Sequence, residues 1–539
     1  MVNKNTKRAK RFKLLISVVL ISALLLGLAG CSSSSENESS SESNINMNQE
    51  GLPIVGEPIT LNVLTVRWGN MGDTFKQNQW LQELEKQTNV KINWQVMSSN
   101  DWGEQKSIML ASGTLPDVIL GDIVFSDSDI VNNLSFFRPL DEYIDQYMPN
   151  LKEAMGETPE MKRISTFPDG KIYSLPSRLP SRPKSSNQPI INQAWLDRLG
   201  LKAPDNTEEL YKVFKAFKEQ DPNGNGKQDE IPYSGSGDIG VDLLNPFGIT
   251  DLNGNSMMVK DGKPVFFPVS GEYKEAIKWA HQLYAEGLID QEIFTQDNTM
   301  VTAKQQNPDA AIVGFSNQWI PDAVFGKWKD EYIAIPPIAG PDGQRYQPGE
   351  PDGMSLRRNE LLITTSCKYP EVVARWADQF YTNEASIQNF WGAIGTVIQK
   401  NDDNTYQLMN PPAGTSADAW YWEQSLRDFG PKYVKPDFEK NITLDKNVGD
   451  GLKLVIDKYG SEYVTTPFPN VMYSAEEFQE LPTLTTDIDS FVRTTRAKWI
   501  TEGNIDQEWN GYLKKLNDMG LERLIQIRSD AYDRYTSIK

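Results

Sequence analysis

The sequence predicts an α/β protein with two lobes, each built on a mainly parallel sheet flanked by helices. Segments with strand and helix patterns alternate through residues 59–122, which is the order that a mainly parallel sheet requires. A second alternating series begins near Pro189. The chain of 539 residues is also longer than the roughly 250–300 residues that a single hydrophobic core supports.

The first series starts with "ITLNVLTVRW", residues 59–68, whose apolar side chains alternate as in a strand. A helix pattern over 78–89 and a second strand over 90–97 follow, and then a helical piece around 106–111. The run "LPDVILGD", residues 115–122, predicts a short buried strand.

Polar and aromatic side chains follow two of these strands. Arg67, Trp68 and Asn70 come at the end of the first strand, and Asp122 ends the third. Sheets of this kind bind ligands beyond the carboxyl ends of their strands. These side chains are therefore candidates for ligand contact.

The second series has equally clear signals. Asn206 and Glu209 have the spacing of a capping box at the start of a helix. The pair Asp261-Gly262 predicts a turn between short strands, and residues 273–286 predict a helix. A strand of small and apolar residues then ends at Trp319.

Between these elements, residues 221–230 place oxygen-bearing side chains at every second position. Calcium binds six to eight oxygens in a flexible loop, with ligands at loop positions 1, 3, 5, 7 and 9. Pro232 occupies position 12, where a Glu is usual, and Glu230 is the substitute. The alternative is a polar turn without metal. The candidate calcium ligands are Asp221, Asn223, Asn225, Lys227 through its carbonyl, Asp229 and Glu230.

The N-terminus has the pattern of an export signal. Six Lys and Arg residues precede an uncharged run from Leu14 to Leu28, which predicts a signal peptide over residues 1–30. A retained transmembrane anchor is the alternative, although this run is shorter than the roughly 20 residues needed to span a bilayer. The sequence "LAGC" resembles the lipobox of bacterial lipoproteins, in which Cys31 becomes the diacylated first residue.

The body of the chain is strongly acidic. Residues 31–56 form a polar segment that predicts a disordered tether. The formal net charge is −19, and loss of the six positive charges of the leader brings the mature chain to about −25. Such a field excludes nucleic acid as a partner. With Cys31 acylated, Cys367 has no partner for a disulfide and is expected to be buried.

Taken together, several segments resemble the extracellular solute-binding proteins of carbohydrate ABC importers, in particular the alginate-oligosaccharide-binding subgroup. They are "LPDVI", "DGKIYSLP", "INQAWLDRLGL", "DPNGNGKQDEIP", "AAIVGFSNQW", "KYPEVVARWADQFY" and "WNGYLKKLNDMGLERLIQIRSDAYDRY". The resemblance extends over nearly all residues after Cys31.

The resemblance implies a two-lobed, periplasmic-binding-protein-like clamp of type II. The clamp would close on an oligosaccharide and deliver it to an ABC permease, as a monomer with structural calcium in residues 221–230. Its lipid anchor at Cys31 would hold it on the extracellular face of the cell membrane. We expect the first lobe to comprise residues 57–185 and 352–395, and the second lobe residues 186–351 and 396–539.

Sugars present apolar C–H faces and a rim of hydroxyl groups, so a site for them needs exposed aromatic rings. Trp68, Trp319 and Trp391 are at the expected ends of elements, and Trp319 matches a stacking Trp of the wider sugar-binding superfamily. Trp420 and Trp422 either contact ligand or anchor a helix.

Two arginines, Arg178 and Arg182, follow the "GKIYSLP" segment on the way to the second lobe. They either line the cleft or form a solvated pair. If they line the cleft, an acidic sugar becomes a plausible ligand, because nearby groups outweigh a distant field.

The sequence does not favour an enzyme. Its one histidine, His281, lies in a helix pattern beside the apolar face, which indicates a structural role. Two alternatives stay open: a secreted glycoside-active enzyme, which needs only two carboxylates, and a lipoprotein that binds peptides.

Overall fold

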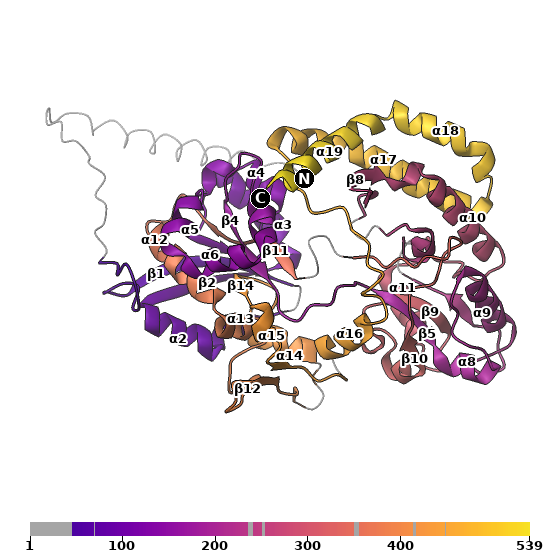
Figure 1. The fold of residues 1–539 in the computed structure, drawn as a ribbon, viewed down its shortest axis with the longest axis horizontal. Coiled ribbons are helices and arrows are strands. Elements are labelled where there is room, and N and C mark those ends of the chain that lie inside the picture. The colour runs from indigo at the N-terminus through magenta and orange to yellow at the C-terminus, as the bar shows by residue number, and fades with distance from the viewer. Residues whose placement is uncertain are drawn as a thin grey trace, which may run out of the picture. The chain divides into compact units, whose positions relative to one another are not determined.

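The computed structural model describes residues 46–68, 71–235, 241–250, 254–349, 355–412, 415, 417–447 and 449–538. Cys31 and Asn70, singled out above, lie outside the described residues. Two main sheets organise the chain from Met47 onward (Figure 1).

The first sheet has six strands, which lie side by side in the order β14 (Lys432–Tyr433), β4 (Ser174–Arg178), β11 (Leu356–Ile363), β3 (Val118–Leu120), β1 (Ile59–Arg67) and β2 (Val90–Ser98). β11 runs antiparallel to its neighbours, whereas the other five strands run in one direction. The strands expected over 59–68, 90–97 and 115–122 are β1, β2 and β3.

The second sheet has four strands, in the order β10 (Tyr332–Ala334), β5 (Gln188–Asn192), β9 (Val313–Gln318) and β6 (Ile231–Tyr233). β5 runs antiparallel to both neighbours. Two smaller sheets pair β12 (Ile398–Lys400), β13 (Tyr406–Leu408) and β15 (Ile442–Thr443), and β7 (Met257–Lys260) with β8 (Lys263–Phe266). The expected turn at Asp261-Gly262 joins β7 to β8, with positive φ at both residues.

Helices cover both sheets. Those of the first lobe are α2 (Gln79–Thr88), α3 (Ser99–Ser112), α4 (Asp127–Val131), α5 (Asp141–Tyr147), α6 (Pro149–Glu157), α7 (Pro159–Ser165), α12 (Pro370–Asp378), α13 (Asn383–Phe390), α14 (Ala417–Gln424) and α15 (Pro436–Glu439). α2 and α3 contact β2, and α7 contacts β4 and β11.

The remaining helices are α8 (Gln193–Leu199), α9 (Thr207–Glu219), α10 (Gly271–Ala285), α11 (Asn298–Gln305), α16 (Gly449–Asp457), α17 (Ala475–Glu502), α18 (Ile505–Asp518) and α19 (Leu521–Ser537). α9 begins where expected, because the Asn206 side chain accepts a hydrogen bond from the Glu209 N–H. None of the helices that the structure describes is long and apolar enough to cross a membrane.

The apolar side chains form separate cores for the two lobes. The second core joins α9 and α10 to α17, α18 and α19, around buried residues such as Trp195 and Trp499. The first core lies around β1 and β3. Cys367 is buried, as expected, and this burial raises the pKa of its thiol to about 11.

The expected lobe boundary at residue 396 does not follow the sheets. β14 belongs to the first sheet, and Tyr406, Leu408 and Tyr421 pack with Leu179 and Phe390 in one cluster. The sequence pattern could not reveal this, because β14 is only two residues long. We propose that residues 396–443 belong to the first lobe and that the chain crosses to the second lobe before α16.

α16 fixes the segment that leads from β4 to β5. The Asp457 carboxylate accepts hydrogen bonds from the N–H groups of Lys184 (3.1 Å) and Ser185 (2.9 Å). The ammonium group of Lys453 donates to the carbonyl of Ser186. The segment by which the chain first passes from the first lobe to the second is therefore held in place by α16.

α17 is shared by both cores. Ala475 and Phe478, in its first turn, pack against the first core, whereas Leu481 and Ile488 belong to the second. Ser474 and Glu477 form a capping box that fixes the start of the helix. Pro482 lies inside the helix.

Two buried charged side chains, Lys432 and Glu360, hold the turn that follows α14. The ammonium group of Lys432 donates to the carbonyls of Asp428 (3.2 Å), Phe429 (2.9 Å) and Gly430 (2.6 Å). The Glu360 carboxylate accepts from the Gly430 N–H at 2.7 Å. Burial lowers the pKa of Lys432 to about 8 and raises that of Glu360 well above its ordinary value.

We predict that Lys432→Met lowers the free energy of unfolding by about 3–5 kcal/mol, because it leaves three carbonyls without their partner and removes the positive charge near the buried Glu360. Urea denaturation measures this. The matched control is Lys435→Met, whose surface pair with Glu153 is worth at most about 1 kcal/mol. Equal losses in the two variants would contradict the role of Lys432.

Candidate functional site

The candidate site lies where β1 and β3 end. These strands are parallel neighbours, so their carboxyl ends meet at one edge of the sheet. Trp68 follows β1 and exposes 47% of its surface, and Asp122 follows β3. The structure therefore brings together two of the side chains that the sequence singled out.

The turn after α14 reaches the same edge. The Phe429 ring lies 6.2 Å from that of Trp68 and 5.5 Å from that of Trp422, measured between ring centroids. Gly121, with φ of +107°, allows this approach, because a Cβ there would lie 3.3 Å from Phe429. Phe429 and Trp422 thus support the exposed indole of Trp68, and we call the three side chains the aromatic platform.

Charged groups flank this platform. Burial raises the pKa of Asp122 to about 6, although the guanidinium of Arg357 opposes the rise. The carboxylate of Asp428 is close enough to add to the rise. Asp122, Arg357 and Asp428 therefore form one electrostatic group beside Trp68. We call Trp68, Asp122, Arg357, Trp422, Asp428 and Phe429 together the sheet-edge site.

Arg67 fastens the turn to the end of β1. Its guanidinium donates to the carbonyls of Ser425 (3.2 Å), Leu426 (3.3 Å) and Trp422. Burial lowers the pKa of Arg67 to about 10. The role of Arg67 is thus to position the turn.

Asp450, at the start of α16, joins three segments. Its carboxylate accepts from Arg427 at 2.9 Å, from Arg182 at 3.4 Å and from the indole N–H of Trp391 at 3.3 Å. Burial alone would raise the pKa of Asp450, but Arg427, Arg182 and these hydrogen bonds hold it below its ordinary value. The charges of Asp428 and Arg357 also act on Arg182, which places it near the sheet-edge site.

The other side chains that the sequence singled out, Trp319, Arg178 and Trp391, differ in their surroundings. Trp319 is half-buried, with the Lys453 ammonium 4.4 Å and the Arg182 guanidinium 5.4 Å from the centre of its ring. Arg178 pairs with Glu439 at 3.2 Å and lies at the end of β4. Trp391 is fully buried, which does not fit the expected ligand contact; it lies behind the site, on Asp450.

The sequence did not single out Arg357, Arg427 or Asp428 as site residues. The run "LRDFGPK", with Gly430-Pro431 as a stop, marks a loop. Nothing in the sequence places that loop beside β1 and β3, because its position depends on β14.

The oxygen-rich loop is tightly wound. Asp221 accepts hydrogen bonds from the N–H groups of Asn225 (3.1 Å) and Gly226 (3.0 Å), and the amides of Asn223 and Asn225 donate to Asp229 at 3.0 Å. These contacts bring the oxygen-bearing side chains of the loop together at the end of α9.

The donor set of the loop fits a hard cation. Glu230 is buried, and neither of its carboxylate oxygens has a hydrogen-bond partner. This burial raises the pKa of Glu230, and nearby Asp221 and Asp229 add to the effect. In the described ranges, no three His, Cys, Asp or Glu side chains form a group that could hold a metal. Amide and carbonyl oxygens would therefore have to complete the coordination.

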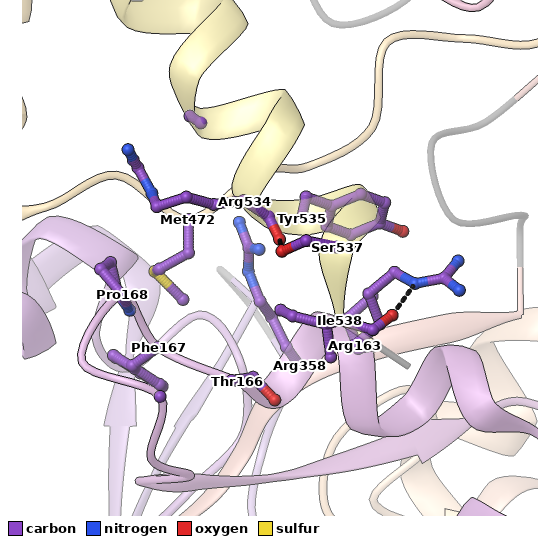
Figure 2. A pocket seen from close by; sticks show the side chains of 13 residues that line it. Arg163, Thr166, Phe167, Pro168, Arg358, Met472, Arg534, Tyr535, Ser537 and Ile538 are labelled. Atoms are coloured by element: carbon purple, nitrogen blue, oxygen red, sulfur yellow. Dashed lines mark hydrogen bonds between the residues drawn. The ribbon is translucent and has the colours of Figure 1, made fainter.

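A separate pocket of about 200 Å³ lies between α7 and α19. Figure 2 shows Arg163, Arg358 and Arg534 around it. Arg358 pairs with Asp127, Arg534 pairs with Glu477, and Arg163 donates to the carbonyl of Ile538 at 3.3 Å. An anion in this pocket would have to compete with partners that are already present.

Comparison with known proteins gives concordant results. The model of the family described as bacterial extracellular solute-binding protein matches residues 68–387. The fructooligosaccharide ABC transporter substrate-binding protein FusA of Streptococcus pneumoniae is 33% identical over 545 residues, covering 97% of this chain and 98% of that protein.

Solved structures are similar over most of the chain. FusA in complex with kestose has a TM-score of 0.74 at 32% identity, covering 89% of this chain and 100% of that one. A further FusA structure is of an EF-hand mutant with fructo-nystose. A protein of Bifidobacterium longum infantis described as HMO-binding has a TM-score of 0.78 at 28% identity, covering 89% and 99%. Alginate-binding protein AlgQ2, at 24% identity and a TM-score of 0.64 with 89% and 99% covered, shows the fold alone.

We predict that Asp122→Asn stabilises the protein at neutral pH. A folded pKa of about 6, above the unfolded value of about 3.9, means that stability present at low pH is lost as the pH rises through 6. The variant removes this loss, so its gain should be roughly 1–3 kcal/mol near pH 7.5 and well under 1 kcal/mol near pH 4.

Urea unfolding of both proteins at the two pH values measures the difference. Asp402→Asn, at an exposed loop position, is the control and should give no such difference. A gain of the same size at both pH values would show that the pKa of Asp122 is not raised.

Proposed function

Because the chain belongs to the bacterial extracellular solute-binding proteins, we propose that it captures an oligosaccharide between its lobes and delivers it to an ABC permease. The observation that carries this proposal is the exposed Trp68, supported by Phe429, beside the carboxylates of Asp122 and Asp428. FusA, which is 33% identical over nearly the whole chain, supports it through its complex with kestose.

The chemistry of the sheet-edge site suits a sugar. An indole can cover the apolar face of a pyranose or furanose ring, as aromatic rings stack on other flat ligands. Carboxylate oxygens accept hydrogen bonds from hydroxyl groups, and charge-assisted bonds of this kind are the stronger ones. Trp319 and Arg182 would contact the ligand from the other side, and Arg178 from farther out. Asn70 and Trp391 complete the set named from the sequence: Asn70 lies outside the described residues, and Trp391 would act through Asp450.

We also propose the anchor and the assembly. Cys31 would carry the lipid, with palmitate among its acyl chains, and would hold the mature protein on the extracellular face of the cell membrane. Two acyl chains give stable anchoring, whereas one is marginal. The protein would act there as a monomer.

A second candidate function follows from the same carboxylates. Asp122 with a raised pKa near Asp428 is the kind of pair that glycosidases use as acid and base. Membership of a solute-binding family favours binding without turnover. The distinction is experimental, because an enzyme would produce new reducing ends.

The oxygen-rich loop would hold calcium. Asp221, Asn223, Asn225, Asp229 and Glu230 would bind it through side-chain oxygens and Lys227 through its carbonyl, while the ion would supply positive charge beside the buried Glu230. The EF-hand mutant of FusA supports this proposal. The role of the metal would be structural, since the loop joins the end of α9 to β6.

We predict that the mature protein binds an oligosaccharide in calorimetry without producing reducing ends. Trp68→Ala should weaken binding about 5- to 150-fold, since stacking contributes about 1–3 kcal/mol. Its loss of stability should be smaller than the roughly 3–5 kcal/mol of a buried aromatic, because half of Trp68 is exposed. Trp319→Ala should also weaken binding.

The matched control is Trp80→Ala. Trp80 is half-buried in the same lobe, and its ring packs on Phe380 at 5.0 Å rather than on Phe429. This variant should keep its affinity. Steady release of reducing ends would instead establish the glycosidase, and unchanged affinity in Trp68→Ala would move the binding site elsewhere.

We predict that chelation of calcium lowers the melting temperature by several degrees, because a ligand present at 100 times its Kd stabilises the fold by about 2.7 kcal/mol. Asp221→Asn should remove most of the response to calcium. Asn tolerates the positive φ of 47° at this position, so the backbone stays unstrained. Asp402→Asn should respond to calcium as the natural chain does.

Differential scanning fluorimetry with calcium and with EDTA gives the readout. Identical melting curves of the natural chain in the two conditions would mean that residues 221–230 are a polar turn.

A further inference from the structure

We propose that the ligand is a neutral oligosaccharide and that the sheet-edge site disfavours uronic acids. This inference rests on the proposed function and specifies the charge of the sugar. Its basis is the way in which the charged side chains around the site are already paired.

The arginines that border the site have protein partners, while Arg357, inside the site, donates to the carbonyl of Leu356 at 2.9 Å and lies near the charge of Asp122. Arg182 and Arg427 share the buried carboxylate of Asp450, at 3.4 and 2.9 Å. Arg178 pairs with both oxygens of Glu439, at 3.2 and 3.3 Å, and also donates to the carbonyl of Val434 at 2.7 Å. The Nε of Arg182 is buried without a hydrogen-bond partner, so a uronate would have to displace Asp450 or Glu439 to gain a two-point ion pair with these guanidinium groups.

Two further cations have carbonyl partners, although the buried Nε of Arg67 has none. The guanidinium of Arg67 is turned toward backbone carbonyls of the loop after α14 and is buried. Lys453 donates to the carbonyl of Ser186 and interacts electrostatically with the carboxylate of Asp457. The charged groups of Arg67 and Lys453 thus hold loops in position.

The carboxylates are in the opposite situation. No side chain in the described part of the chain donates a hydrogen bond to Asp428 or to Asp122, while both lie within electrostatic reach of each other. Their oxygens can accept from the hydroxyl groups of a sugar. The charge of Arg357 acts on Asp122 and on Glu360, and Asp428 interacts at longer range with Arg67, Arg182 and Lys432, which already have protein partners. A carboxylate on the ligand would meet like charges here, and like-charge contacts are strongly unfavourable in an interface.

The pocket in Figure 2 does not change this balance. Arg358 and Arg534 in it are paired with Asp127 and Glu477. The net charge of −19 of the whole chain likewise repels an anionic ligand at long range.

Calorimetry with two sets of oligosaccharides of similar length tests the inference: neutral ones (fructo-, galacto-, manno- and xylo-oligosaccharides) and uronates (oligogalacturonates and alginate oligosaccharides). We expect binding within the neutral set, and binding at least about tenfold weaker throughout the uronate set. Tighter binding of a uronate would overturn this inference and leave the proposed function intact. Binding of no oligosaccharide would overturn both.

Two further measurements use the neutral sugar that binds best. Its affinity should be nearly the same at low and high salt, because it carries no charge to be screened; a steep salt dependence would contradict the inference. Asp428→Asn should weaken binding about tenfold, since a charge-assisted hydrogen bond becomes a neutral one. Asp402→Asn, at an exposed loop position, is the control and should bind normally. Unchanged binding in a folded Asp428→Asn protein would overturn the role given to this carboxylate.

Discussion

The candidate site depends on one buried carboxylate. Asp450 binds Arg182 from the first crossing between the lobes, Arg427 from the turn after α14 and Trp391 from the end of α13. Arg182 is 268 residues from Asp450 in the sequence, whereas Trp391 and Arg427 are 59 and 23 residues from it. A buried ion pair with a missing partner is strongly destabilising, so the three segments are held in a single mutual arrangement. The aromatic platform and the acidic pair take their positions from it.

A second set of buried charged groups also fixes the turn that follows α14. Lys432 and Glu360 together satisfy the backbone of residues 428–430, the turn that carries Asp428 and Phe429. The first lobe therefore contains several ionised or ionisable groups in its interior, each of which costs free energy to bury. Such a cost at a proposed binding site is typical of proteins in which function and stability compete.

Much of the fold could be predicted from local patterns. Alternation identified β1 and β2, and a short apolar run identified β3. The end of each strand could be placed within a residue or two, so Trp68 and Asp122 were correctly expected at one sheet edge. Family membership confirms the two-lobed fold class. The loop with Arg427 and Asp428 could not be located in this way, because β14 is two residues long and its partner β4 lies about 250 residues earlier in the chain. The burial of Trp391 could not be predicted for a similar reason. It packs in one cluster with residues 179, 397 and 421, and no local sequence periodicity relates them to it.

α17 has a mechanical consequence that its length alone would not suggest. Its first turn packs on the first core and its later turns, from Leu481 onward, pack on the second, and Pro482 directly follows Leu481. Proline has no N–H to donate to the carbonyl one turn earlier, so a helix is most easily bent at that point. A movement of one lobe against the other can therefore be taken up as a flexion at Pro482, while the side chains on either side of it keep their packing.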